Sequence, residues 1–131
     1  MKLITRNTDY AVRAICCIAK NKNMVFSVSH LVKESKVPRP FLRKILQILS
    51  KRGIVDSYKG KGGGFKLAEL SEHIFLKDLI EIFQGPLRLN ECYFKKKKCP
   101  NVGACSLKKK IDTIERDLIN DLSSITISSL L

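Results

Sequence analysis

The sequence predicts a mainly α-helical protein with one small β-hairpin. Apolar residues recur at helical spacing in several segments, and the short turn Lys36–Pro40 joins two of them as in a helix-turn-helix. A glycine run over residues 60–64 then separates two strand-like segments, and a heptad-like apolar series lies near the C-terminus. This order predicts a winged helix-turn-helix over residues 1–84. A cysteine-containing loop and a long C-terminal dimerisation helix are expected over residues 85–131.

Composition favours a folded protein of the cytoplasm. The chain has 131 residues, of which 44% are hydrophobic, so wholesale disorder is disfavoured. No apolar run approaches the ~18 residues of a membrane span, and the first residues lack the pattern of a signal peptide. Five cysteines is an odd number, which fits reduced thiols better than a disulfide framework. We therefore expect a cytoplasmic protein with no membrane partner.

The positive charge is concentrated in the first half of the chain. The formal net charge is +13, and residues 1–70 carry 15 Lys and Arg against four acidic residues. Residues 71–131 carry 10 Lys and Arg against eight acidic residues. A concentrated basic surface favours a polyanionic partner, with nucleic acid first and an acidic membrane second. A solvated basic surface without a specific ligand is the alternative.

The first helix is expected to begin with a cap at Asn7 or Thr8 and to end near Lys20. Its apolar residues fall on one face at helical spacing. Cys16 and Cys17 lie within this helix, and we expect them to be small buried hydrophobic residues, which is the usual environment of a free cysteine on an apolar helix.

The next two helices form the predicted helix-turn-helix. Ser27 or Ser29 caps a short helix that ends near Ser35, and the prolines of the following turn suit the first turn of a new helix. That helix spans Phe41–Arg52 and ends at Gly53. Its expected buried side consists of Phe41, Leu42, Ile45, Leu46, Ile48 and Leu49.

The opposite side of this helix is basic and amide-bearing, as in a recognition helix. Arg and Gln side chains can form bidentate contacts with guanine and adenine edges. We expect contacts with DNA from six residues of the helix-turn-helix, namely Ser29, Arg39, Arg43, Lys44, Gln47 and Lys51.

The glycine run predicts a hairpin, or wing. Ile54–Tyr58 and Phe65–Leu67 are strand-like, and the glycines between them permit positive φ and close approach to phosphate. The run lacks the G-x-x-x-x-G-K-[ST] pattern of a nucleotide-binding loop and does not begin a helix. We expect the wing to contact DNA through Lys59, Lys61, Gly62 and Lys66.

Two further helices complete the chain. Ile74–Gln84 is amphipathic, is closed by Gly85 and Pro86, and is expected to pack under the hairpin. The last helix begins near Ala104, and its apolar stripe packs either on its own domain or, as we expect, against a second copy. A two-fold dimer would present two recognition helices about one DNA turn (~34 Å) apart to a near-palindromic operator. The expected dimer contacts are Leu107, Ile111, Ile114, Leu118 and Leu122.

Three cysteines, Cys92, Cys99 and Cys105, lie within a lysine-rich loop. Neighbouring lysines and the positive end of the last helix favour the thiolate form, which binds soft metals. Zinc sites usually show paired C-x2-4-C spacing, and neither gap here is that short. An iron–sulfur cluster needs about four ligands but tolerates wider loops. The remaining alternative is three unconnected thiols.

Together these features resemble the Rrf-type dimeric bacterial transcription regulators, whose members include IscR, NsrR and RirA. The three-cysteine loop before a long helix is part of the likeness, which extends from Met1 to about Leu122. The other matching stretches are Thr8–Ala14, Pro38–Leu49, Gly53–Ser57 and Gly60–Ala68.

The resemblance implies a homodimer that binds operator DNA, usually as a repressor, and an iron–sulfur cluster (2Fe-2S or 4Fe-4S) that purification can remove. By position its cysteine ligands are Cys92, Cys99 and Cys105. In the IscR-like branch the fourth ligand is a histidine three residues after the last cysteine, where this chain has Lys108. In the NsrR-like branch it is an aspartate of the other subunit, and Asp9 falls at that position. Stabilisation of the helix N-terminus is the alternative role of Asp9.

One departure from the family pattern concerns the loop. The family commonly has five residues between the first two cysteines, whereas this chain has six. The extra residue can be absorbed as a bulge, but it bears on cluster type and stability.

The sequence therefore predicts a transcriptional regulator whose operator binding is gated by an iron–sulfur cluster that senses nitric oxide, redox state or iron. The alternative is a cluster-free regulator of the same fold that responds to thiol oxidation, a small ligand or a partner protein. An enzyme is not expected. The chain has only two histidines, no Ser/His/Asp arrangement, no paired carboxylates in a cleft motif and no nucleotide loop.

Overall fold

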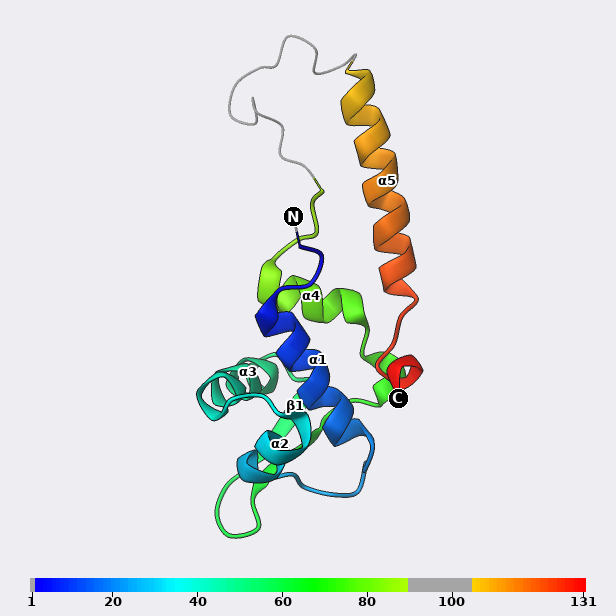
Figure 1. The fold of residues 1–131 in the computed structure, drawn as a ribbon. Helices are drawn as coiled ribbons and strands as arrows, with labels where there is room; N and C mark the ends of the chain where they lie inside the picture. The colour runs from blue at the N-terminus through cyan, green and yellow to red at the C-terminus, as the bar shows by residue number, and fades with distance from the viewer. Residues whose placement is uncertain (1, 90–104) are drawn as a thin grey trace.

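A computed structural model of the chain describes residues 2–89 and 105–131. It has the predicted fold class, mainly α-helical with a two-stranded antiparallel hairpin (Figure 1). No helix in these two stretches is both long and apolar enough to cross a membrane. The elements in chain order are α1 (Arg6–Ala19), α2 (Val28–Ser35), α3 (Arg39–Lys51), β1 (Val55–Tyr58), β2 (Gly64–Leu67), a 3-10 turn (Ser71–His73), α4 (Leu76–Gln84), α5 (Ser106–Ser123) and a second 3-10 turn (Ser128–Leu130).

Helix α1 is the centre of the core and packs against α2, α3 and α4. Its small and branched residues recur at helical spacing, which lets the neighbouring helices approach closely. The buried residues of α1 are Thr8, Ala11, Ala14, Ile15, Ile18 and Ala19.

The helix-turn-helix forms as predicted, with Ser27 as the cap of α2. The Ser27 side chain accepts the backbone N–H of His30 at 3.1 Å. Lys36 ends α2 in the left-handed region (φ 60°), and Pro38 caps α3. These two residues change the direction of the chain between α2 and α3.

The prediction that Phe41 and Ile48 are buried is wrong. The buried stripe of α3 consists of Leu42, Ile45, Leu46 and Leu49. Phe41 and Ile48 lie seven residues apart beside this stripe and are 41% and 39% exposed. The Phe41 ring packs against Tyr10 of α1, with 5.9 Å between ring centroids. The buried side of a helix has room for only a limited number of apolar residues. Phe41 and Ile48 therefore lie at the edge of the buried stripe of α3.

The hairpin is tied to the loop before α2. β1 and β2 pair antiparallel, with Val55 opposite Leu67 and Tyr58 opposite Gly64. Beyond this pair, Phe26 and Phe65 exchange two backbone hydrogen bonds of 2.8 and 2.7 Å. The base of the wing is therefore held by three segments of chain rather than two.

The prediction that α4 packs under the hairpin is wrong, because α4 packs mainly against α1 and α5. Its last residue, Gln84, reaches the start of α1. Gln84 Oε1 accepts the backbone N–H of Thr5 at 2.9 Å and the hydroxyl of Thr8 at 2.6 Å. Gln84 Nε2 donates to the carbonyl of Leu3 at 3.0 Å.

This contact corrects the predicted start of α1. The cap residue is Thr5 rather than Asn7 or Thr8, and its own side chain forms no capping hydrogen bond. A side chain from α4 satisfies the Thr5 N–H instead. The buried Thr8 is thereby satisfied as well, because its hydroxyl donates to the same oxygen.

Replacing Gln84 by alanine is expected to lower the free energy of unfolding by about 1–3 kcal/mol. The change leaves the buried Thr8 hydroxyl, the Thr5 N–H and the Leu3 carbonyl without this partner. Chemical denaturation of Gln84→Ala measures the effect. Gln47→Ala is the control, because Gln47 is exposed on α3. Gln47→Ala should change stability by less than about 0.5 kcal/mol. Equal effects of the two substitutions would contradict the assigned role of Gln84.

The C-terminal segment returns to the first part of the chain. Helix α5 packs on α4, and the chain that follows it pairs with the residues before α4. Leu76 N–H donates to the Ile125 carbonyl at 2.9 Å, and Ile127 N–H donates to the Ile74 carbonyl at 2.8 Å. Ile127 is fully buried in the common core. The far end of α5 extends away from that core (Figure 1).

Candidate nucleic-acid interface

The outer face of α3 is basic and open to solvent. Five of the predicted contact residues lie on this helix, and all five are exposed: Arg39, Arg43, Lys44, Gln47 and Lys51. The helix carries no acidic residue. Because its apolar stripe faces the core, the opposite face is left to side chains that can donate hydrogen bonds to base edges and phosphates.

Ser29 and Arg39, which are ten residues apart, meet at the junction of the two helices. Arg39 Nη2 donates to Ser29 Oγ at 3.0 Å, and both residues are exposed. The bond holds the guanidinium at the N-terminal end of α3. A pre-oriented guanidinium loses less side-chain entropy when it binds a phosphate or a base.

The tip of the wing exposes Lys59, Lys61 and Gly62, while Lys66 of β2 is partly buried. Gly60 and Gly62 have φ of 89° and 78°, a region that glycine adopts at little cost. Gly63 N–H donates to the Gly60 carbonyl at 3.0 Å and closes the turn. The tip thus presents two lysines and free backbone, which suits contact with a phosphate backbone.

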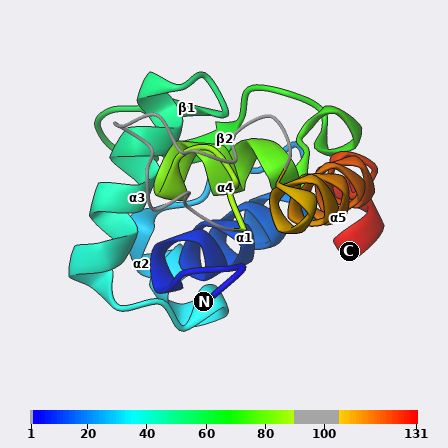
Figure 2. The same ribbon diagram turned by 90° about the horizontal axis from the view of Figure 1, so that it is seen from above.

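Figure 2 shows α3 along one edge of the molecule, with the hairpin at one of its ends and the start of α1 at the other. The elements that carry the predicted DNA contacts are therefore neighbours, because α2 and β1 both pack against α3. A helix with a basic outer face can enter the major groove while a neighbouring hairpin contacts the backbone.

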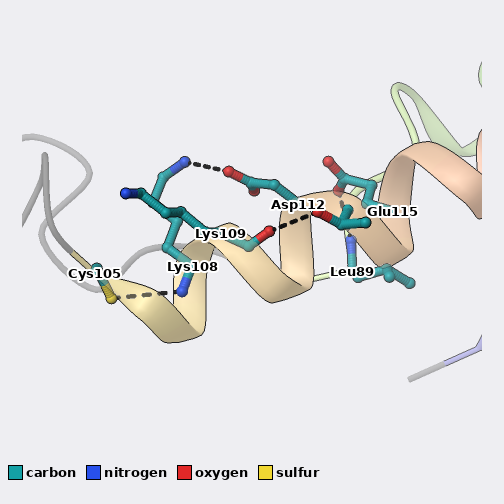
Figure 3. Close-up of polar contacts among 7 residues, drawn as sticks. Leu89, Cys105, Lys108, Lys109, Asp112 and Glu115 are labelled. Carbon is teal, nitrogen blue, oxygen red and sulfur yellow. Dashed lines mark hydrogen bonds and ion pairs between the residues drawn. The ribbon is translucent and has the colours of Figure 1, made fainter.

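The predicted metal ligands are only partly described. Cys92 and Cys99 lie outside the described residues. Cys105 caps α5, and its sulfur accepts the Lys108 backbone N–H at 3.5 Å (Figure 3). Asp9 is half-exposed in the first turn of α1, and its carboxylate pairs with Arg13 at 3.1 Å. Within residues 2–89 and 105–131 no group of three or more His, Cys, Asp or Glu is arranged to hold a metal ion.

Around Cys105, the first turns of α5 are held by polar contacts. Lys108 Nζ donates to Asp112 Oδ2 at 2.6 Å (Figure 3). One turn further, the Leu89 backbone N–H donates to Glu115 Oε1 at 2.9 Å. The chain on one side of the cysteine loop is thereby attached to the helix on its other side.

Cys16 and Cys17 are partly rather than fully buried, which corrects the prediction for them. Burial raises the pKa of both thiols. For Cys16 the neighbouring Cys17 adds to the increase, and Lys20 opposes it for both. These thiols are therefore less nucleophilic than an ordinary surface cysteine.

Three basic residues that no sequence motif indicated, Lys2, Arg6 and Lys36, lie at the start of α1 and at the end of α2. They line an open groove at the start of α1 together with Asp9 and Arg13. Only the basic excess of residues 1–70 could have indicated them from the sequence. Arg6 and Lys36 are far apart in the chain and come together only when α1 packs against the helix-turn-helix.

The dimer contacts predicted on α5 differ in exposure. Leu107 and Ile114 are 68% and 54% exposed, the largest values among the large hydrophobic residues described. Ile111 and Leu118 are partly buried, and Leu122 is buried. The end of the stripe near the core therefore packs within the chain, and the other end is left uncovered.

The chain is similar to known transcriptional regulators. The family described as "Rrf2: Iron-dependent Transcriptional regulator" matches residues 4–131. A candidate HTH-type transcriptional regulator of Aquifex aeolicus (strain VF5) is 33% identical over 124 residues, covering 93% of this chain and 86% of that protein. CymR (YrzC), the global cysteine regulator of B. subtilis, has a TM-score of 0.83 at 21% identity, covering 99% of this chain and 96% of that one. T. potens IscR has a TM-score of 0.76 at 21% identity, covering 99% and 85%.

The match over nearly the whole chain confirms the predicted resemblance, and the two solved structures confirm the winged-helix fold. The relatives are transcriptional regulators rather than enzymes, and a DNA partner follows from that role. The chain belongs to the Rrf2 family of transcriptional regulators.

Proposed function

We propose that this chain is a homodimeric repressor that binds a near-palindromic operator through α3 and the wing. The observation that carries this proposal is the exposed, acid-free outer face of α3 beside a glycine-rich hairpin with two exposed lysines. In this proposal the α3 side chains contact bases and the wing contacts the backbone. Residues 1–84 form the DNA-binding part, and residues 85–131 provide the cysteine loop and the dimer contact.

The different roles of α3 and the wing predict different mutant behaviour. Arg43→Ala should relax base preference at one operator position in each half-site, at a cost of about 1–3 kcal/mol for the preferred base. Lys61→Ala should weaken binding to all sequences alike and reduce the salt dependence, because it removes a phosphate contact. Binding to a library of randomised duplexes at several salt concentrations measures both effects. A Lys61→Ala effect confined to one base pair would contradict this assignment.

We further propose that operator binding is gated by an iron–sulfur cluster held by Cys92, Cys99 and Cys105 of one subunit and Asp9 of the other. The described members of this set fit such a group. Cys105 caps the 18-residue helix α5, and its sulfur already accepts the Lys108 backbone N–H at 3.5 Å, so the sulfur lies where the helix dipole would stabilise a negatively charged metal ligand. The Asp9 carboxylate is half-exposed and pairs with Arg13 at 3.1 Å, so a partner subunit could reach it, but ligation of the cluster would replace that ion pair.

The role of this chain in such a gate is mechanical. Asp9 lies on α1, which packs directly on α3, and Cys105 begins the proposed dimer helix α5. A link between these two positions across the dimer would fix the separation of the two α3 helices. When bound, the cluster supplies a link that nitric oxide, oxygen or iron starvation can break. A change of 1.4 kcal/mol in operator binding is about tenfold, so a small change in separation is enough to regulate.

Anaerobic purification with iron, sulfide and absorbance measurements tests this second proposal. Wild-type protein should absorb in the visible and contain both iron and sulfide, and Cys99→Ala should lose both. Asp9→Ala should keep its fold, since Asp9 is half-exposed, and should hold the cluster less stably. Colourless anaerobic protein would reject the cluster and leave the DNA-binding proposal standing.

The alternative is a cluster-free regulator that responds to thiol oxidation, a small ligand or a partner protein. The likeness to a global cysteine regulator favours this alternative, as does the six-residue gap between Cys92 and Cys99. The absorbance measurement separates the two sensors, because free thiols and zinc do not absorb in the visible.

A further inference from the structure

We infer that the basic groove at the start of α1 is a second contact with the DNA backbone, holding operator phosphate beside the N-terminal end of α3. This inference rests on the proposed DNA binding and adds residues to it. The groove has a volume of about 590 Å³ and is lined by Lys2, Ile4, Thr5, Arg6, Asp9, Tyr10, Arg13, Lys36 and Pro38.

The charge of the groove suits a polyanion. Four of its residues are basic and one is acidic, and that one, Asp9, is already paired with Arg13 at 3.1 Å. Lys2, Arg6 and Lys36 form no ion pair with any residue in the described part of the chain, and all three are exposed. The groove therefore carries three positive charges that no carboxylate in the described part of the chain neutralises, which favours an anionic ligand.

The groove lies directly beside the proposed reading helix. Pro38, which lines it, is the cap of α3, and Lys36 ends α2 just before it. Tyr10 of the groove contacts Phe41 in the first turn of α3. In Figure 1 the start of α1 lies on one side of α3, and the tip of the hairpin lies on the other.

This placement matches the shape of duplex DNA. A helix in the major groove has a phosphate backbone on each side of it. The wing lysines are positioned for one side, and Lys2, Arg6 and Lys36 are positioned for the other. The groove is open and its three unpaired cations are exposed, which suits a continuous phosphate backbone rather than a small enclosed anion.

Salt-dependent binding of duplex DNA tests the inference with Arg6→Gln and Lys36→Asn. Asparagine tolerates the left-handed backbone of Lys36, so the second variant preserves the turn. Each should weaken binding to specific and random duplexes alike, by several-fold to about tenfold. Each should also lower the slope of log K against log salt by about 1 per subunit. Lys20→Ala is the matched control, because Lys20 is exposed at the opposite end of α1 and should leave both quantities unchanged.

The outcomes separate this inference from the proposed function. If Arg43→Ala weakens operator binding while Arg6→Gln and Lys36→Asn keep the wild-type slope, the groove does not hold phosphate and the winged-helix proposal stands. The same result is expected if the groove serves the partner subunit instead, so that result also overturns the inference. If wild-type protein shows no salt-dependent DNA binding, the proposed function fails first.

Discussion

Replacing Gly64 by alanine is expected to destabilise the protein by about 3 kcal/mol or more and to release the wing from the body. A Cβ at this position would overlap the carbonyl oxygen of Phe26, and it would lie 2.5 Å from the carbonyl carbon of Phe26 and 2.9 Å from the Ser27 nitrogen. These are backbone atoms in the segment that exchanges two hydrogen bonds with Phe65, so no side-chain rotation relieves the overlap. The φ of 153° adds strain for any residue with a Cβ. Urea denaturation measures the loss.

Gly62→Ala is the matched control for this prediction. Its φ of 78° is also unfavourable for alanine, but nothing lies within 4 Å of the added Cβ. The control therefore measures the conformational cost alone, about 1–2 kcal/mol. If Gly64→Ala were as stable as Gly62→Ala, the contact between the wing and the Phe26 segment would contribute little to the fold.

The sequence predicted the elements that depend on local patterns. The four central residues of the α3 stripe (Leu42, Ile45, Leu46 and Leu49), the proline turn before it and the glycine run of the wing each have a distinct local signature, and each formed where expected. The basic outer face of α3 followed as a consequence, because the residues that do not fit the apolar stripe must face solvent. The predicted DNA contacts remain a proposal, and their exposure is what the structure adds.

The predictions that failed depend on contacts between distant parts of the chain. The Thr5 cap of α1 donates its N–H to Gln84, which is 79 residues away, and no local pattern indicates this contact. Phe41 was placed in the core because it is apolar, whereas its ring lies at the edge beside Tyr10. Ile127 lies beyond the long helix, yet it belongs to the core built from α1, α2 and α3. Local periodicity identifies an amphipathic element but not the neighbour that covers it.

The last expected result concerns the dimer that is proposed to form through α5. Ile114→Asp should convert the protein to a monomer and weaken binding to a full operator by about 100-fold or more. Ile114 is 54% exposed, so a carboxylate there costs the isolated chain little. In a dimer seam the same carboxylate is desolvated, and it faces its own symmetry mate because a two-fold interface uses the same surface from both copies.

The loss in affinity follows from the linkage of the two half-sites. A dimer binds the second half-site as an intramolecular step, and this advantage, typically 10² to 10⁴, disappears in a monomer. Ile114→Asp should therefore bind an isolated half-site as well as wild-type protein does, while it loses the extra affinity for the full operator. Asn120→Asp is the matched control, since it adds one negative charge to an exposed position of α5 outside the apolar series. Light scattering gives the mass of the assembly in solution, and titration with half and full operators gives the affinity for each. A variant Ile114→Asp that keeps the wild-type mass would place the dimer contact elsewhere and leave the exposure of Leu107 and Ile114 without an explanation.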